Sequence, residues 1–168
     1  MGMQRTRTRA TILVVEDYAD SRHMLKLLLE DLEYRVLTAG SGKEALAAAA
    51  ANHVDLVLLD FGLPDMTGPT VVRYLRRLNA RWARVPIVMI TAFEGYQYRQ
   101  LADEAGCNAF LAKPPDFELL KETLERLLFE PHTTAGSCPK TNGSDERFQD
   151  HSFAGSTHVK VEPSPRSL

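Results

Sequence analysis

The stretch Val54-Asp55-Leu56-Val57-Leu58-Leu59-Asp60 decides the fold of this chain. Its four consecutive apolar residues, Leu56–Leu59, are typical of a strand that is buried on both faces inside a parallel sheet. The run ends on the carboxylate of Asp60, and a loop rich in turn residues follows over Phe61–Gly68. Open α/β sheets bind their ligands beyond the carboxyl ends of the strands, so Asp60 stands where a functional group is expected.

Composition limits the classes of protein to consider. The 168 residues are 44% hydrophobic and 25% charged, with a formal net charge of −2, which is ordinary for one globular domain with an appendage. That charge gives no general basis for binding nucleic acid or a membrane. The two cysteines do not have the spacing of a metal-binding motif or of a disulfide framework. The chain shows neither a signal peptide nor an apolar run of the ~18 residues that a membrane span needs. We therefore expect a cytoplasmic protein with no direct contact to nucleic acid or membrane.

Four further apolar runs predict strands, and the segments between them predict helices. The predicted strands are 11–15, 34–38, 86–91 and 107–112, in addition to the run that ends at Asp60. Helices are predicted after a cap at Asp20 or Ser21, from a Ser41–Glu44 capping box to Ala51, after Thr67, before Gly106 and after Asp116. Strands that alternate with helices imply right-handed crossovers. The sequence therefore predicts a doubly wound α/β fold, with a five-stranded parallel sheet covered by helices on both faces.

The compact domain is predicted to span residues 10–130. Residues 1–9 are expected to be a flexible N-terminus, and residues 131–168 a disordered tail, because a segment so rich in Ser, Thr, Gly and Pro cannot bury enough apolar area to offset its ordering entropy. The tail is a linker remnant, a docking segment or neither. Within the domain, Arg73, Arg76 and Arg77 are predicted to be a solvated helix face, with phosphate binding as the alternative.

Polar side chains stand at the ends of four predicted strands. They are Glu16 and Asp17, Asp60, Thr91 and Lys113. The ends of parallel strands share one edge of the sheet, so these groups are expected to converge. Crowded carboxylates repel one another, and a hard cation such as Mg²⁺ relieves that repulsion. A lysine and a hydroxyl suit phosphoryl oxygens, and a carboxylate can itself accept a phosphoryl group.

Four stretches resemble the receiver domain of two-component response regulators, the chemotaxis-protein-Y-like fold. They are Ile12–Asp17, Leu58–Gly68, Ile87–Ala92 and Ala109–Pro114. The resemblance covers about residues 10–130 and implies the flavodoxin-like strand order 2-1-3-4-5. It also implies a cis peptide bond between the last two residues of the fourth stretch, Lys113 and Pro114.

The resemblance assigns roles to the converging residues. It implies that Asp60 is the phosphoacceptor and that Thr91 and Lys113 engage the phosphoryl group. Phe110 would be a switch aromatic that turns inward when Thr91 moves, which alters the face formed by the fourth helix, fifth strand and fifth helix; a half-buried edge aromatic is the alternative. The implied Mg²⁺ ligands are Glu16, Asp17, Asp60 and the backbone carbonyl of Gly62.

Three positions depart from or vary within the family pattern. Glu16 stands where the family more often has Asp, which leaves ligand placement and metal affinity less defined. Gly62 and Phe93 occupy variable positions, two residues after Asp60 and Thr91, that tune how fast the acyl phosphate hydrolyses in this family. The lifetime of the acyl phosphate is not predicted.

The resemblance implies a signalling switch and not an enzyme. The expected partners are a sensor histidine kinase or a histidine phosphotransfer protein upstream and a protein target on the switched face, and a homodimer is a further arrangement that it allows. Since no output domain follows residue 130 in this sequence, a stand-alone regulator is expected. The alternatives are a degenerate receiver that docks proteins constitutively and a phosphatase with an Asp nucleophile, which is disfavoured because Gly62 stands where such enzymes carry a second Asp.

Overall fold

Five strands form one parallel sheet in the computed structural model, which describes residues 10–93 and 95–129. Their order across the sheet is β2-β1-β3-β4-β5, which confirms the predicted topology. The predictions for residues 1–9 and 131–168 lie outside the described residues. The strands are β1 Thr11–Val15, β2 Arg35–Ala39, β3 Leu56–Asp60, β4 Ile87–Thr91 and β5 Ala109–Ala112.

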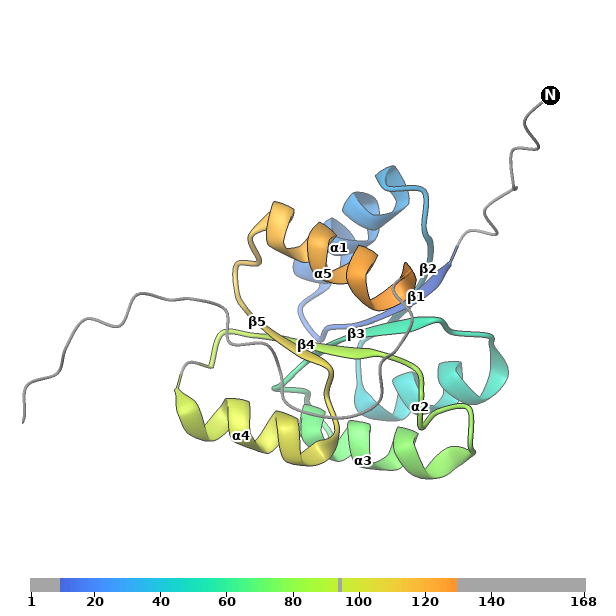
Figure 1. The fold of residues 1–168 in the computed structure, drawn as a ribbon, viewed down its shortest axis with the longest axis vertical. Helices are drawn as coiled ribbons and strands as arrows, with labels where there is room; N and C mark the ends of the chain where they lie inside the picture. The colour runs from blue at the N-terminus through green and yellow to red at the C-terminus, as the bar shows by residue number, and fades with distance from the viewer. Residues whose placement is uncertain (1–9, 94, 130–168) are drawn as a thin grey trace, which may run out of the picture.

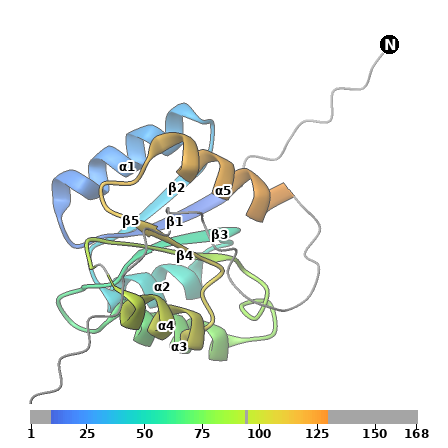
Figure 2. The ribbon, with the colours of Figure 1, turned by 60° about the vertical axis from the view of Figure 1, so that its left-hand side comes forward.

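Helices cover both faces of the sheet (Figures 1 and 2). Two of them, the first and the last, lie on one face, and the other three lie on the opposite face. Within the described part of the chain, none has the length and apolar character that crossing a membrane requires. The helices are α1 Ala19–Asp31, α2 Gly42–Ala51, α3 Gly68–Leu78, α4 Tyr96–Ala105 and α5 Phe117–Phe129.

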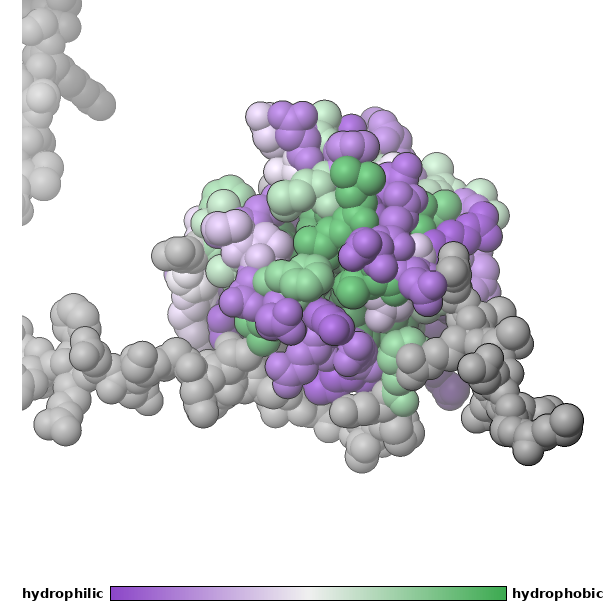
Figure 3. All heavy atoms as spheres, turned by 90° about the horizontal axis from the view of Figure 1, so that it is seen from above, coloured by the Kyte–Doolittle hydropathy of each residue, from purple (hydrophilic) through white to green (hydrophobic). Residues whose placement is uncertain are grey.

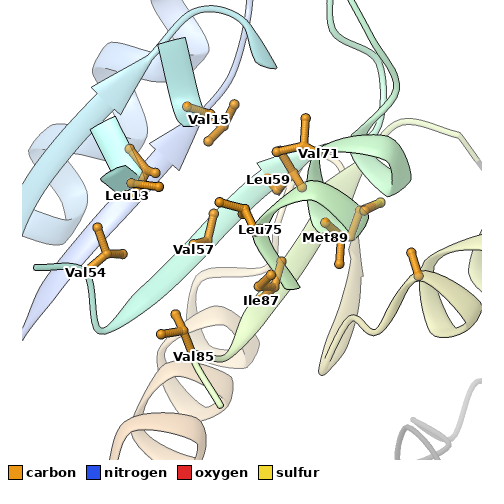
Figure 4. Close-up of a cluster of buried hydrophobic side chains, with 14 of the residues drawn as sticks. Leu13, Val15, Val54, Val57, Leu59, Val71, Leu75, Val85, Ile87 and Met89 are labelled. Carbon is orange, nitrogen blue, oxygen red and sulfur yellow. The ribbon is translucent and has the colours of Figure 1, made fainter. Parts of the chain in front are cut away.

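The strand side chains alternate between two cores, because successive residues of a strand point to opposite faces of the sheet. In β3, Val57 and Leu59 pack beneath α2, α3 and α4, while Leu56 and Leu58 pack beneath α1 and α5. Figure 4 shows the first of these cores, where strand side chains meet Val71 and Leu75 of α3. Burial on both faces explains why the central strands β1, β3 and β4 are mainly apolar, whereas the edge strand β2 also carries Arg35 and Thr38.

The helix boundaries are set by caps that the sequence predicted only in part. The Ser41 side chain accepts a hydrogen bond from the Glu44 N–H at 3.2 Å, and Asp116 Oδ1 accepts one from the Leu119 N–H at 2.9 Å, as predicted. The prediction of a cap at Asp20 or Ser21 was wrong. The α1 helix begins at Ala19, after an extended Tyr18 that makes no side-chain cap hydrogen bond.

Helical spacing in the sequence places Met24, Leu78 and Leu119 on the apolar stripes of α1, α3 and α5, which predicts that they are buried. In the structure they are exposed instead, with exposed fractions of 50%, 44% and 37%. Figure 3, which looks onto the side of α1 and α5, accordingly shows hydrophobic atoms among hydrophilic ones at the surface.

Arg76 is half-buried, so the prediction of a fully solvated arginine face was wrong at this position. Its guanidinium donates hydrogen bonds to the carbonyl oxygens of Trp82, Val85 and Gly106 at 2.5, 2.7 and 2.7 Å, and to Asn108 Oδ1 at 3.0 Å. Burial lowers the pKa of Arg76, although an arginine stays charged. This one side chain therefore joins α3 to the loop before β4, the end of α4 and the start of β5.

Candidate functional site

The strand register brings the predicted site residues to one edge of the sheet. Asp60 pairs with Ile90 across β3 and β4, and Thr91 follows directly. Thr91 in turn pairs with Ala112 of β5, the residue before Lys113. Glu16 follows Val15, which pairs with the residue before Asp60. The convergence predicted from the strand ends is confirmed.

The Lys113 ammonium lies between two carboxylates. Its Nζ atom is 2.6 Å from Asp60 Oδ2 and 2.5 Å from Glu16 Oε2. The Glu16 and Asp60 side chains are only 3% and 11% exposed, so these charges interact with little screening by solvent. Burial by itself lowers the Lys113 pKa, but hydrogen bonds and charge from Asp60 and Glu16 outweigh it and raise that pKa.

Three carboxylates form a cluster with a composition suited to a hard cation. Glu16, Asp17 and Asp60 each offer one oxygen, and these oxygens lie within 4.8 Å of one another. Glu16 is buried and Asp17 is exposed, so the cluster can be reached from solvent on one side. One lysine cannot neutralise three carboxylates, and Mg²⁺ prefers oxygen ligands while keeping several waters. The residues present therefore fit a magnesium ion.

The loop after Asp60 is held tightly against the start of α3. The Gly62 N–H donates to Asp60 Oδ1 at 3.4 Å, Gly62 also bridges to Thr67, and the Gly68 N–H donates to the Phe61 oxygen at 2.7 Å. A Cβ atom at Gly68 would lie 2.5 Å from the Asp60 carbonyl oxygen. Glycine at position 68 is therefore required for α3 to begin this close to Asp60.

Asp65, at the tip of that loop, is an anchor that sequence analysis missed. Its carboxylate oxygens accept hydrogen bonds from the Gly42 and Lys43 N–H groups at 2.8 and 2.9 Å. These bonds lower the pKa of Asp65 and join the loop to the first turn of α2. The partners lie 23 and 22 residues away in the chain, so no local pattern could have shown the contact.

Arg22 of α1 is a second anchor that was missed. Its Nη1 atom donates to the carbonyl oxygens of Glu16 and Asp17 at 2.6 and 3.1 Å. The guanidinium thereby fixes the backbone that carries two of the clustered carboxylates. The sequence held one signal for this contact: Arg22 lies one turn into the helix that follows Glu16 and Asp17.

Thr91 and Phe110 lie on the neighbouring strands β4 and β5. Thr91 is fully buried, and its hydroxyl accepts a hydrogen bond from the Phe93 N–H at 3.1 Å. Phe110 is half-buried, with the Arg99 guanidinium carbon 5.3 Å from its ring centre. Both Phe93 and Phe110 line a hollow of about 350 Å³ between α4 and β5. Of the two predicted switch residues, Phe110 therefore borders a surface depression, and Thr91 does not line it.

The geometry and the sequence together identify the family. The family model described as the response regulator receiver domain matches residues 12–125. The chain belongs to the response regulator receiver domain family. Members act as phosphoacceptors in two-component signalling, where they interact with histidine kinases or phosphotransfer proteins. The peptide bond between Lys113 and Pro114 is cis, as the resemblance implied.

Curated relatives carry this receiver domain within longer proteins. The chain is 34% identical over 138 residues to the transcriptional regulatory protein ZraR of Salmonella typhimurium, a match covering 82% of this chain and 31% of ZraR. It is 34% identical over 113 residues to the sensor histidine kinase RcsC of Escherichia coli, covering 67% of this chain and 12% of RcsC. The chain thus spans about a third or less of these relatives.

Solved structures show the same fold over most of the chain. The chemotaxis response regulator CheY4 of Vibrio cholerae is 35% identical, with a TM-score of 0.67, covering 72% of this chain and all of CheY4. The receiver domain of the sensor histidine kinase PA1611 from Pseudomonas aeruginosa is 31% identical, with a TM-score of 0.67, covering 73% and 99%. The latter structure has a magnesium ion coordinated in its active site cleft. Receiver domains bind Mg²⁺ at an acidic site, and this chain has an acidic cluster formed by Glu16, Asp17 and Asp60.

Proposed function

We propose that Asp60 accepts a phosphoryl group from a histidine kinase or histidine phosphotransfer protein in a Mg²⁺-dependent reaction. The observation that carries the proposal is the Asp60 carboxylate held 2.6 Å from the Lys113 ammonium, beside two further carboxylates within 4.8 Å. A nucleophile, a cation for phosphoryl oxygens and oxygen ligands for a metal are the groups that phosphoryl transfer requires. Their meeting at one sheet edge supports this function.

The chain's own residues have distinct roles in this transfer. An Asp60 carboxylate oxygen attacks phosphorus, so a P–O bond forms while the P–N bond to the donor imidazole breaks and the imidazole leaves with the bonding electrons. Lys113 moves from the Asp60 carboxylate to a phosphoryl oxygen and keeps Glu16 as its counter-charge. The Thr91 hydroxyl donates to another phosphoryl oxygen. When bound, Mg²⁺ offsets the negative charge that gathers on the carboxylates and phosphoryl oxygens, with Glu16, Asp17, Asp60 and the Gly62 carbonyl as its proposed ligands.

The signal is proposed to leave through the face formed by α4, β5 and α5. A Thr91 hydroxyl that turns toward the phosphoryl group vacates space beside β5, into which Phe110 turns. The supporting observation is the hollow between α4 and β5, which Phe93, Tyr96 and Phe110 line. Inward movement of Phe110 changes the shape of that hollow and hence the fit of a protein target, or of a second copy of the chain.

Beryllofluoride, a stable mimic of the phosphoryl group, tests whether the site is competent. In the presence of Mg²⁺, calorimetric titration is expected to show one bound beryllofluoride per chain and none for Asp60→Asn. Amide resonances of α4 and β5 are expected to shift on binding, and the Phe110→Ala variant should bind beryllofluoride but lose most of those shifts. A folded wild type that binds no beryllofluoride would instead indicate a degenerate receiver that docks proteins constitutively.

A further inference from the structure

Arginines crowd the outer surface of α3 and the loop that follows it. From Met66 to Phe93 the sequence has five arginines and neither aspartate nor glutamate. Arg76 is the anchor described above, and the other four are exposed. Two apolar side chains, Tyr74 and Leu78, are 53% and 44% exposed among them. We call this area the basic α3 surface, formed by Arg73, Tyr74, Arg77, Leu78, Arg81 and Arg84.

These four exposed arginines make no ion pair within the described part of the chain. None of the ion pairs or hydrogen bonds there involves the side chain of Arg73, Arg77 or Arg84. Arg81 donates to the Val54 carbonyl oxygen. Arg77 lies in the last turn of α3, where a cation stabilises the helix through a favourable interaction with its dipole. That effect does not account for Arg73, which lies earlier in the helix, nor for the two arginines beyond its end.

A hollow of about 510 Å³ adjoins these arginines. Arg81 and Arg84 line it together with Val54, Ala80, Val85, Pro86 and one carboxylate, Asp55. The Asp55 oxygens are already engaged by the Thr11 N–H at 2.8 Å and the His53 ring at 2.9 Å. The surface therefore offers guanidinium groups beside apolar contact area. Guanidinium groups bind carboxylates in a planar, often bidentate geometry, and neighbouring apolar area suits a ligand with apolar side chains.

The backbone beneath this surface is firmly held. The Arg76 guanidinium binds the carbonyl oxygens of Trp82 and Val85, and the Trp82 side chain is only 1% exposed. The arginines of the loop are thus carried on a segment fixed before any ligand arrives. Such preorganisation reduces the entropy lost on binding.

We propose that the basic α3 surface binds a short acidic segment of a partner protein that also carries apolar side chains. Residues 131–168 have four basic and four acidic residues, so this tail has no acidic excess with which to occupy the surface itself. An α3 of 11 residues is about 16 Å long, enough for a short segment. A nucleic acid would extend beyond it onto a molecule with a net charge of −2, which repels phosphates.

This surface lies away from the phosphoacceptor site. The hollow is bordered by Val54, Val85 and Pro86, which precede strands β3 and β4, whereas Asp60 ends β3. The proposed contact therefore includes the amino ends of these strands, opposite to the end of β3 that carries Asp60. It serves as a constitutive anchor for a partner, and its affinity does not depend on the state of Asp60.

Fluorescence anisotropy of a fluorescein-labelled peptide of Glu-Glu-Leu repeats tests the proposal. Saturable binding to the wild-type chain is expected, with weaker binding at high salt and to an all-Glu peptide that lacks leucine. The double variant Arg73→Glu/Arg77→Glu and the single variant Arg84→Glu should each bind roughly tenfold or more weakly. The milder pair Arg73→Gln/Arg77→Gln gives an intermediate loss and serves if charge reversal impairs folding.

The control places the same change in charge on the other side of the molecule. Lys26→Glu/Lys121→Glu, on α1 and α5, should leave peptide affinity within about twofold, since the basic α3 surface is intact. Beryllofluoride with Mg²⁺, or the Asp60→Asn variant, should leave it unchanged, so this test stands even if Asp60 accepts no phosphoryl group. Absence of peptide binding, an equal loss in the lysine control, or tighter binding of a single-stranded RNA of equal charge would overturn the proposal.

Discussion

Lys113 is the residue on which the electrostatics of the site depend. It is the cation that contacts both Glu16 and Asp60. The Lys113 ammonium and a magnesium ion are attracted to the same carboxylates, so removal of the ammonium should strengthen metal binding. The same change should weaken the response to phosphorylation, because the phosphoryl group loses its cation. We predict that Lys113→Met binds Mg²⁺ roughly three- to tenfold more tightly, as measured by isothermal titration calorimetry.

An exposed lysine provides the comparison for that measurement. Lys26→Met removes a charge from α1, where Lys26 is 41% exposed and pairs with Glu30, and it should leave Mg²⁺ affinity unchanged. If Lys113→Met bound Mg²⁺ no more tightly than wild type, the ammonium would not be competing with the metal for the carboxylates.

Gly68 determines how closely two elements, helix α3 and strand β3, approach each other. Its missing side chain would contact the Asp60 carbonyl oxygen at 2.5 Å and the Phe61 Cα at 3.0 Å, and backbone atoms cannot move aside easily. We predict that Gly68→Ala lowers the free energy of unfolding by about 1–3 kcal/mol and weakens beryllofluoride binding, because Asp60 is displaced. Urea denaturation and beryllofluoride titration measure the two effects.

Gly62→Ala is the matched variant in the same loop. A Cβ atom there would meet the Phe93 ring edge at 3.2 Å, and Phe93 is 45% exposed and can shift. Its loss of stability should be clearly smaller than that of Gly68→Ala. Equal losses would mean that the contact with the Asp60 backbone is not the cause.

Arg76 joins three elements through one guanidinium. We predict that Arg76→Ala lowers the free energy of unfolding by about 2–4 kcal/mol, because four acceptors lose a charged donor. Arg76→Lys should restore little, since an ammonium cannot match the planar set of acceptors. Arg73→Ala, on the exposed side of α3, should cost no more than about 0.5 kcal/mol in the same urea denaturation experiment. A loss for Arg76→Ala that is no larger would show that the hydrogen bonds contribute little.

The elements that could be predicted from sequence are those with a local signal. The three central strands, β1, β3 and β4, consist mainly of apolar residues because both of their faces are covered, and the Ser41 cap lies within three residues of its partner. The role of Arg76 could not be predicted, because three of its four acceptors are backbone carbonyls that no pattern displays and the fourth, Asn108 Oδ1, lies 32 residues away. The exposure of Met24 and Leu78 could not be predicted, because helical spacing assigns a residue to an apolar stripe but does not show how much of that stripe is covered.

At the scale of the whole molecule, topology explains why the candidate site could be predicted at all. A parallel sheet brings every strand end to one edge, so Asp60, Thr91 and Lys113 converge although they are far apart in the chain. The anchors Asp65 and Arg22 could not be predicted in the same way, since their contacts depend on how loops pack on helices.

The same topology separates the two proposed functions in space. The carboxyl ends of the strands carry the proposed phosphoacceptor, and the basic α3 surface lies toward their amino ends. One end of the molecule can therefore change with phosphorylation while the other keeps a partner bound.

Intact-mass analysis after incubation with Mg²⁺ and acetyl phosphate tests directly whether Asp60 accepts a phosphoryl group. We expect wild type to gain one phosphoryl group and Asp60→Asn to gain none, and omission of Mg²⁺ should abolish the gain. A phosphoryl group on Asp60→Asn, or an unmodified wild type that is folded and also fails to take a phosphoryl group from a histidine phosphotransfer protein, would contradict this expectation.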